Sequence, residues 1–336
     1  FGDNGSGKTS ILEAIHLLSL GKSFKTNKKK ELIKKGEKQL VLNGLFEKNE
    51  IKTKVSTSIN INNQQQIKIN GKKIFNRKNL IGKNSVVVLS PEEQKITKGA
   101  PKERRLFFDK LFSITSKKYI NSIQKYNKVL KQRNAVLKSK DKNINKILDL
   151  WDTPLIEKGV EVWNQKNKNI KTFQNILKKT ALKYDKNIKI VLKYKQKPIE
   201  KIEYQNKIKE NRKKDIILKR TSFGPHCDDF IFYWNNKLIR SFGSQGEHKI
   251  FLVILKFTEL IYIKEITKEQ PILLLDDLFA TIDLKRGKKT ISTLKKIAKS
   301  QKKQIQTIIT TTDLHSLDKI GFNIKNFKKQ IHELRR

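Results

Sequence analysis

The stretch Gly2-Asp3-Asn4-Gly5-Ser6-Gly7-Lys8-Thr9 decides the fold, because it satisfies the pattern G-x-x-x-x-G-K-[ST] in full. In this pattern the glycines let backbone N–H groups turn inward around a phosphate, and the lysine reaches the β- and γ-phosphates. The apolar periodicity of residues 10–20 predicts the helix that must follow the loop. A plain glycine-rich turn is the alternative, and the helical context disfavours it. We expect ATP to be bound here, with Lys8 as the catalytic cation and with contacts from Gly2, Asp3, Asn4, Gly5, Ser6, Gly7, Lys8 and Thr9.

A second candidate part of an ATP site lies near the other end of the chain. Residues 272–275 are a short apolar run that predicts a buried strand, and Asp276 and Asp277 follow it directly. A buried parallel strand delivers its last residues to the sheet edge where ligands bind. We expect Asp276 and the Thr9 hydroxyl to hold Mg²⁺, and Asp277 to polarise the attacking water. Many ATPases of this kind carry Glu at the second position, so the shorter Asp277 predicts slow hydrolysis.

The sequence Ser244-Gln245-Gly246-Glu247 has the form of the signature motif of ABC-type ATPases and precedes an apolar helical run. In such ATPases the serine hydroxyl, a glycine amide and a helix N-terminus bind the γ-phosphate of the ATP held by the other protomer. The alternative is an ordinary serine that caps a helix. The position shortly before Asp276 favours the signature motif, so we expect Ser244 and Gly246 to act in catalysis across an ATP-dependent homodimer.

Composition restricts the partners. Lys and Arg number 75 and Asp and Glu 32, for a formal net charge of +43. Such a surplus favours nucleic acid, because neutralised phosphates release their condensed counterions. A compositional bias toward Lys, Asn and Ile accounts for the surplus equally well. No run of 18 apolar residues is present, which excludes a transmembrane helix within the chain. We therefore expect no membrane partner. The single Cys227 excludes an intrachain disulfide and fits a cytoplasmic location.

The remaining patterns predict an α/β chain that a helical insertion interrupts. Short strands are expected within 38–89, with a hairpin turn at Asn70-Gly71 and a buried strand at 86–89. From 102 to 184 the pattern is helical and strongly basic, with its second helix at 155–181. Alternating aromatic residues predict a strand at 230–234, and the last third also predicts a helix at 284–299 and a buried strand at 305–309. We expect a nucleotide-binding lobe I at 1–90 plus 216–336, built on a mixed sheet with helices, and a helical lobe II at 91–215. Because the chain begins at Phe1 and contains no Met, we expect a fragment whose first strand is missing.

Taken in order, these motifs resemble the RecF family of ABC-type ATPases. The resemblance runs from Asp3 to Thr312 and includes several further motifs: Gly21-Lys22-Ser23-Phe24-Lys25-Thr26, Pro91-Glu92, Lys98-Gly99, Arg104-Arg105, Gln132-Arg133-Asn134, Gly224-Pro225-His226 and Asp228-Asp229. It implies an ABC-type P-loop ATPase head with a helical insertion. The insertion is too short for the extended coiled coil of SMC or Rad50 proteins, since a helix rises by only about 1.5 Å per residue.

The resemblance also implies a function. Members of this family are expected to form an ATP-dependent homodimer that binds double-stranded and single-stranded DNA and favours the junctions at gaps. They are expected to assist the loading of RecA together with RecO and RecR. Hydrolysis of ATP to ADP and phosphate would be weak, stimulated by DNA, and would release the DNA.

The sequence departs from the family pattern at three places. Cys227 stands where Arg is usual, Glu247 where Gln is usual, and Ala280-Thr281-Ile282-Asp283 where Ser-Glu-Leu-Asp is preferred. Three alternatives remain: a soluble ABC-type ATPase subunit of a transporter, a P-loop kinase, and a DNA-binding protein that keeps ATP as a structural ligand. The transporter alternative requires a switch histidine where Thr310-Thr311-Thr312 stands.

Other polar residues carry weaker hypotheses. We expect Asp228-Asp229 to form a turn rather than a metal pair, and Arg104-Arg105 to form ion pairs within the helical lobe. His226 either contacts nucleotide or supports its loop. Lys22 and Lys25 are candidate DNA phosphate contacts or solvated charges, and His315 is expected at the surface.

Overall fold

The computed structural model describes residues 1–139, 141–195, 200–279, 282–299, 305–322 and 330–334. The chain divides into two compact units. Unit 1 comprises the described parts of 1–94, 183–186 and 244–336, and unit 2 those of 95–182 and 187–243.

The elements of unit 1 are α1 (Lys8–Leu20), β1 (Gln39–Lys48), β2 (Ile51–Asn60), β3 (Gln65–Ile69), β4 (Lys72–Ile74), β5 (Val86–Leu89), α9 (Gln245–Thr267), β9 (Ile272–Asp276), α10 (Leu284–Lys299), β10 (Thr307–Thr310) and α11 (Leu314–Lys319). Those of unit 2 are α2 (Lys95–Lys98), α3 (Pro101–Thr115), α4 (Lys117–Val136), α5 (Ile144–Tyr184, whose last two residues belong to unit 1), β6 (Ile190–Tyr194), α6 (Lys201–Glu210), α7 (Arg212–Leu218), β7 (Phe230–Trp234), β8 (Lys237–Leu238) and α8 (Ile239–Phe242). Single 3₁₀ turns lie at Lys29–Leu32, Arg77–Asn79, Pro91–Gln94 and Pro225–Cys227.

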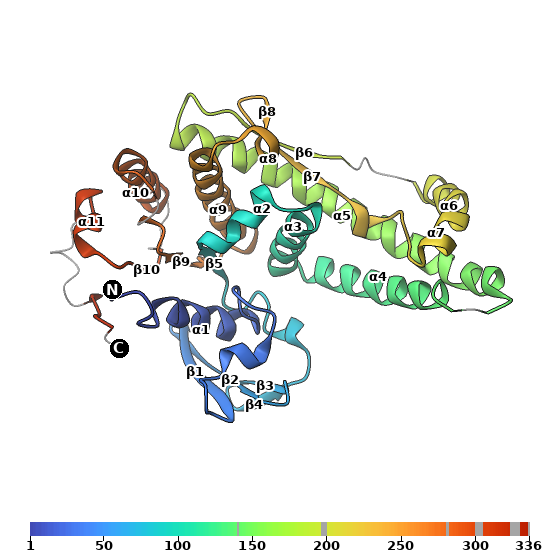
Figure 1. The fold of residues 1–336 in the computed structure, drawn as a ribbon, viewed down its shortest axis with the longest axis horizontal. Coiled ribbons are helices and arrows are strands. Elements are labelled where there is room, and N and C mark those ends of the chain that lie inside the picture. Colours follow the sequence, from blue (N-terminus) through green and yellow to red (C-terminus); the bar gives the residue numbers. More distant parts are fainter. Residues whose placement is uncertain (140, 196–199, 280–281, 300–304, 323–329, 335–336) are drawn as a thin grey trace. The chain divides into compact units, whose positions relative to one another are not determined.

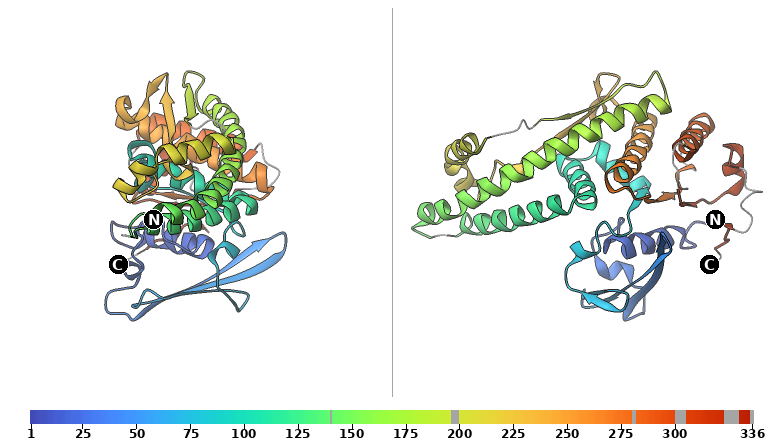
Figure 2. Two further views of the ribbon diagram at one scale, coloured as in Figure 1. Left: turned by 90° about the vertical axis from the view of Figure 1, so that its right-hand side faces the viewer. Right: turned by 180° about the vertical axis from the view of Figure 1, so that it is seen from behind.

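A parallel three-stranded sheet with the order β10-β9-β5 forms the centre of unit 1. Its strands are the apolar runs that the sequence predicted, and β5 is buried along its whole length. Helix α1 lies on one face of this sheet and α9 on the other (Figures 1 and 2). Because all three strands run in the same direction, their carboxyl ends meet at one edge, where Thr310 lies beside Asp276.

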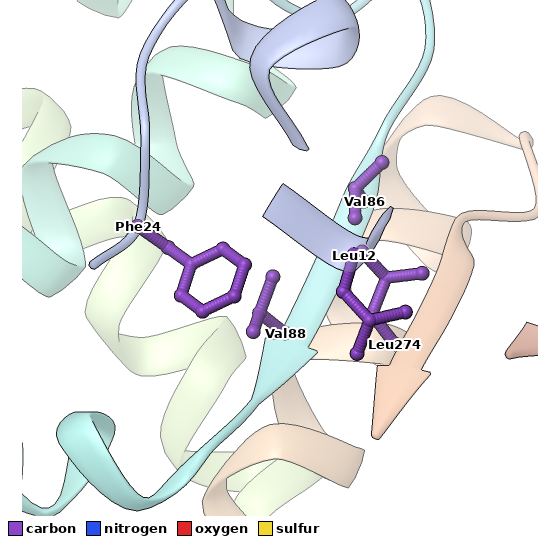
Figure 3. Packing of buried hydrophobic residues seen from close by; sticks show 5 residues of the cluster. All are labelled: Leu12, Phe24, Val86, Val88 and Leu274. Carbon is purple, nitrogen blue, oxygen red and sulfur yellow. The ribbon is translucent and has the colours of Figure 1, made fainter. Parts of the chain in front are cut away.

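Apolar side chains fix α1 against this sheet (Figure 3). Leu12 of α1, Val86 and Val88 of β5, Leu274 of β9 and Phe24 from the loop after α1 form one buried cluster. Each of these side chains is buried, and burying one aliphatic side chain stabilises a fold by about 1.5–3 kcal/mol. This packing sets the position of the helix that the phosphate-binding stretch begins.

A second sheet in unit 1 is an antiparallel meander with the order β1-β2-β3-β4. The predicted hairpin at Asn70-Gly71 is confirmed: both residues have positive φ, 48° and 79°, as a two-residue type I′ turn requires. Val55 and Ile67 from its inner face pack against Leu18, near the C-terminal end of α1. The meander therefore holds the far end of the helix whose start lies at the sheet edge.

Unit 2 is built on α3, α4 and α5 with the antiparallel sheet β6-β7-β8. The expectation of a helix from residue 155 was wrong in its start, because α5 begins at Ile144 and continues through Pro154. Leu148 and Leu155, on either side of this proline, are wholly buried, so tertiary packing outweighs the backbone hydrogen bond that proline removes. No described helix is both long and apolar enough to cross a bilayer.

The division of the chain differs from the expected one mainly at residues 216–243, which belong to unit 2 instead of the nucleotide-binding unit. Residues 91–94 and 183–186, expected in the helical lobe, belong to unit 1. Strand β7 pairs with β6, and the ring of Phe230 in β7 lies 4.3 Å from that of Phe108 in α3. Asp229 forms an ion pair with Arg104 of α3 at 2.9 Å. The alternating aromatic pattern correctly predicted a strand here. It did not indicate that this strand packs against α3.

Candidate functional site

The phosphate loop, residues 2–9, leads directly into α1. Gly7 precedes the helix with φ of 90°, a conformation that glycine adopts at little cost, and it has no side chain that could cap the helix. The first N–H groups of α1 are therefore available to an anion. Lys8 folds back over the loop, where its Nζ donates to the carbonyl oxygens of Gly2 at 2.6 Å and Asp3 at 2.8 Å. A phosphate oxygen could take the place of these carbonyls.

Hydrogen bonds join the phosphate loop to the end of β9. The Thr9 hydroxyl donates to Asp276 Oδ1 at 3.0 Å, although the two residues are 267 positions apart. The Thr310 hydroxyl, from the neighbouring strand β10, donates to the same oxygen at 2.7 Å. Asp276 is buried. Thr9 and Asp276, the two expected cation ligands, thus lie side by side. Thr310, at the end of β10, holds the Asp276 carboxylate in place.

Asp277 occupies a special backbone position at the same edge. Its φ is 46°, which is uncommon for a residue with a side chain. Its N–H group donates to Thr310, with 3.2 Å to both the carbonyl oxygen and the hydroxyl oxygen. Oδ1 of Asp277 is buried and has no hydrogen-bond partner among the described residues. A buried carboxylate oxygen without a partner costs free energy, so a bound water or substrate is the natural partner for it.

The residues at this edge fit ATP with Mg²⁺. Magnesium takes oxygen ligands and is commonly bound by one or two protein groups, with phosphate oxygens and waters completing its shell. Thr9 and Asp276 supply such oxygens. The described residues contain no group of three or more His, Cys, Asp or Glu that could hold a metal ion alone. Ser6 Oγ is also buried without a partner in the described part of the chain, and Asn4 of the same loop is exposed.

Ser244 caps the N-terminus of α9. Its hydroxyl accepts a hydrogen bond from the Glu247 N–H at 3.2 Å, and the Glu247 carboxylate accepts one from the Ser244 N–H at 2.8 Å. This reciprocal capping box confirms the helix start. Ser244 is exposed. Ser244 can therefore both cap α9 and act in a signature motif, because its hydroxyl lies at an accessible helix N-terminus.

Gly246 lies against the guanidinium group of Arg286, on α10. A Cβ atom at Gly246 would stand only 2.1 Å from Arg286 Nη1, so a larger residue would displace that side chain. Arg286 also forms an ion pair with Asp283 at 3.3 Å. A pocket of about 270 Å³ lies at this place, and its lining residues are Gly246, Lys249, Ile250, Ile282, Asp283 and Arg286. Because residue 246 is a glycine, the guanidinium group of Arg286 can approach the backbone of the signature motif. The sequence did not identify Arg286 as a partner of this motif.

The structure brings together most, but not all, of the predicted site residues. The phosphate loop, Asp276 and Asp277 are connected through Thr9 and Thr310. Among the described residues, the hydrogen bonds of Ser244 lead to its own helix and not to the phosphate loop. Ala280 and Thr281, which belong to the departure from the family pattern at 280–283, lie outside the described residues. Thr310 was missed as a site residue, although its place at the end of the last apolar strand could have indicated it.

Known proteins are similar in sequence to this chain over most of its length. A family model described as RecF/RecN/SMC N terminal domain matches residues 1–332. The DNA replication and repair protein RecF of Clostridium novyi is 35% identical over 333 residues, which cover 97% of this chain and 90% of that protein. The chain belongs to the RecF family. RecF of Clostridium perfringens (strain 13) is 36% identical over 328 residues, covering 94% of this chain and 86% of the relative.

Solved structures agree with the membership in the RecF family. The recombination mediator protein RecF-ATP in the RecFOR pathway matches with a TM-score of 0.82 and 29% identity, over 94% of this chain and 85% of that one. An Smc head bound to the C-winged helix domain of ScpA matches with a TM-score of 0.51 and 16% identity, over 95% and 82% of the two chains. The second likeness concerns the fold alone. The expected fold class, an α/β ABC-type ATPase head, is confirmed.

Two other RecF-family motifs have structural partners in unit 2. Arg104 pairs with Asp229, and Asp228 is buried and accepts hydrogen bonds from Trp163 at 2.9 Å and from Lys166 at 3.3 Å. The expectation of an ion pair is thus confirmed for Arg104. Arg105 instead donates to the backbone carbonyl oxygen of Asp228 at 2.8 Å. Burial raises the pKa of Asp228, and the positive charge of Lys166 opposes this shift. These groups stabilise the start of β7.

His226, of the Gly-Pro-His motif, supports its own loop. One ring nitrogen lies 2.6 Å from the hydroxyl of Tyr126 and the other 2.9 Å from the carbonyl oxygen of Thr221. Burial lowers the pKa of His226. Cys227, where the RecF family usually has Arg, is exposed, and His315 lies at the surface of α11 as expected.

Proposed function

We propose that this chain is an ATP-dependent DNA-binding protein of recombinational repair and replication, which hydrolyses ATP to ADP and phosphate. The observation that carries the proposal is the meeting of Lys8, Thr9, Asp276 and Asp277 at one sheet edge. Membership in the RecF family supports the role in DNA repair. The transporter alternative has no support at the site, because Thr310-Thr311-Thr312 takes the place of the switch histidine.

The reaction assigns a separate role to each residue of the edge. Lys8 would leave the loop carbonyls and bind the β- and γ-phosphates, where its charge offsets the negative charge that develops on the leaving oxygen. Asp277 would orient a water molecule whose oxygen attacks the γ-phosphorus as the bond to the β–γ bridging oxygen breaks. Magnesium held by Thr9 and Asp276 would supply further charge neutralisation. The short side chain of Asp277 would make hydrolysis slow.

The exposed signature segment would complete the site of a second copy. Ser244 and the backbone of Gly246 lie at the N-terminus of α9, which favours an anion through its unpaired N–H groups and its dipole. We propose that they bind the γ-phosphate of ATP held by the partner protomer, which gives a two-fold homodimer with two sandwiched nucleotides. The dimer would form with ATP and open after hydrolysis.

The closed dimer would hold DNA. The formal charge of +43 supports binding to phosphate backbones without base reading. We propose that double-stranded DNA and junctions with single-stranded DNA are bound in the cytoplasm, that DNA stimulates hydrolysis, and that the complex assists RecO and RecR in loading RecA. The name of a solved relative, RecF in the RecFOR pathway, supports the last step.

Analytical ultracentrifugation of the chain with ATP, ADP or no nucleotide, with and without gapped DNA, tests the proposal. ATP should produce a dimer, and Lys8→Arg and Ser244→Arg should remain monomers. Ser116→Arg is the matched control, because Ser116 also caps a helix, α4, but lies in unit 2. A dimer of unchanged stability in Ser244→Arg would refute the shared nucleotide site. DNA affinity that neither rises with ATP nor falls with salt would refute the DNA-binding role.

A further inference from the structure

Thr310 ends β10 and faces the carboxylate strand directly. The register of the two parallel strands pairs Thr310 with Asp276, so the sheet itself delivers the threonine to the candidate site. Thr310 is almost fully buried, with 8% of its surface exposed. Its side chain belongs to none of the motifs that identify the nucleotide site. Its hydrogen bonds nevertheless reach both acidic residues of that site.

The hydroxyl group of Thr310 uses its donor and an acceptor position at the same time. It donates to Asp276 Oδ1 at 2.7 Å, and a lone pair faces the N–H group of Asp277 at 3.2 Å. A hydroxyl has one hydrogen to donate and two lone pairs to accept with, so both contacts can exist together. One side chain thereby restrains the carboxylate of Asp276 and the backbone of Asp277.

These two restraints act where the backbone would otherwise relax. A residue other than glycine with φ near 46° is held there only when its surroundings determine the conformation. The contact from the Asp277 N–H to the Thr310 side chain supplies part of that determination. Oδ1 of Asp276 also accepts from Thr9, so the hydroxyls of Thr9 and Thr310 together fix the direction in which the carboxylate points.

We propose that Thr310 is a positioning residue for ATP hydrolysis, a role that rests on the proposed function. Its hydroxyl orients Asp276 toward the nucleotide and holds Asp277 in the backbone conformation that aims its carboxylate at the attacking water. Residues that orient groups around a metal site typically change affinity or activity by roughly 10–100-fold when replaced. Valine at this position keeps the shape of the side chain and favours a strand, so it removes the hydroxyl with little other change.

The test compares Thr310→Val, Thr310→Ser and the control Thr307→Val with the wild-type chain. Thr307 begins the same strand, and within the described part of the chain its hydroxyl makes a single long contact, 3.5 Å to the carbonyl oxygen of Ile305. ATP hydrolysis gives kcat and KM, and a fluorescent ATP analogue gives nucleotide affinity in Mg²⁺ and in EDTA. Thr310→Val should lower kcat by roughly 10–100-fold and reduce the gain in affinity from Mg²⁺, with affinity in EDTA unchanged. Thr310→Ser should restore both.

Three outcomes would overturn the proposal. The first is a Thr310→Val variant that matches Thr307→Val in kcat and in its response to Mg²⁺. The second is failure of Thr310→Ser to recover activity, which would assign the effect to the methyl group and its packing. The third is an equal loss of affinity in Mg²⁺ and EDTA. If Thr310→Val does not fold, the serine variant alone decides, since it must then behave as wild type. A wild-type chain no more active than Lys8→Ala would instead contradict the proposed function.

Discussion

Replacing Arg133 with Met is expected to destabilise unit 2 strongly, although Arg133 lies in none of the nucleotide-binding motifs. Arg133, on α4, is wholly buried. Its Nε donates to Asp152 of α5 at 2.7 Å, and its Nη1 donates to Asp215 of α7 at 2.7 Å and to the hydroxyl of Thr221 at 2.8 Å. Methionine would fill much of the space but would leave two acidic side chains without this cation.

The two carboxylates lose different shares of their stabilising partners when Arg133 is removed. Asp152 keeps an ion pair with Arg212. Asp215 is wholly buried, and among the described residues its carboxylate keeps hydrogen bonds from Ser222 alone. Breaking a buried pair by removing one partner costs about 3–5 kcal/mol, because a buried charge remains uncompensated. For a unit of this size 1 kcal/mol shifts Tm by about 2–4 °C, so Tm should fall by roughly 6–20 °C.

Tryptophan fluorescence measures this effect selectively. All three tryptophans of the chain, Trp151, Trp163 and Trp234, lie in unit 2. Thermal and urea unfolding followed at tryptophan emission would therefore report on unit 2. Arg240→Met is the control, since Arg240 is exposed and surface substitutions usually change stability by less than about 0.5 kcal/mol.

The double variant Arg133→Met with Asp215→Asn decides the physical reason. Asparagine removes the uncompensated charge, so the double variant should be more stable than Arg133→Met alone. A loss of less than about 1 kcal/mol in Arg133→Met would contradict an uncompensated buried charge, as would costs of the two substitutions that simply add.

Two further predictions concern the nucleotide site and the loop before β7. Asp277→Asn should lower kcat by roughly 10²–10⁴-fold and leave ATP affinity intact, as single-turnover kinetics and binding of a fluorescent ATP analogue would measure, and a wild-type rate would remove Asp277 from catalysis. Burial lowers the pKa of His226 below its ordinary value, with Arg105 and Lys166 adding to the shift and the Thr221 carbonyl opposing it. The unfolded chain then binds the proton more readily, so unit 2 should lose stability as the pH falls through 6.5 toward the lowered pKa. His226→Gln should weaken this dependence in tryptophan-monitored melts at pH 7.5 and 5.5, and an equal pH dependence in both proteins would contradict the assignment.

Local chemistry made the phosphate loop and the sheet strands predictable. A left-handed glycine such as Gly7, an Asn70-Gly71 turn, and an apolar run that ends in Asp276 each depend on a few adjacent residues. The bounds expected for α10 from periodicity, 284–299, agree with the structure. Such local patterns can be recognised in a single sequence because a given backbone conformation, such as a positive φ, requires particular residue types.

Contacts between distant segments explain what the sequence did not predict. The two hydroxyls on Asp276 come from residues far from it in the chain, and a threonine at a strand end looks like any β-branched residue. Proline usually marks a helix boundary, yet buried leucines on both sides of Pro154 keep α5 continuous through it. The assignment of 216–243 failed for the same reason, because β6 and α3 select the partner of β7.

The exposed Cys227 has a practical consequence for following assembly in solution. It is the single cysteine of the 336-residue sequence and lies in unit 2. A maleimide dye would therefore label each copy at one defined point without any engineered removal of thiols. Mixing donor-labelled and acceptor-labelled copies would convert the meeting of two molecules, and their separation after the nucleotide is spent, into a fluorescence signal recorded in real time.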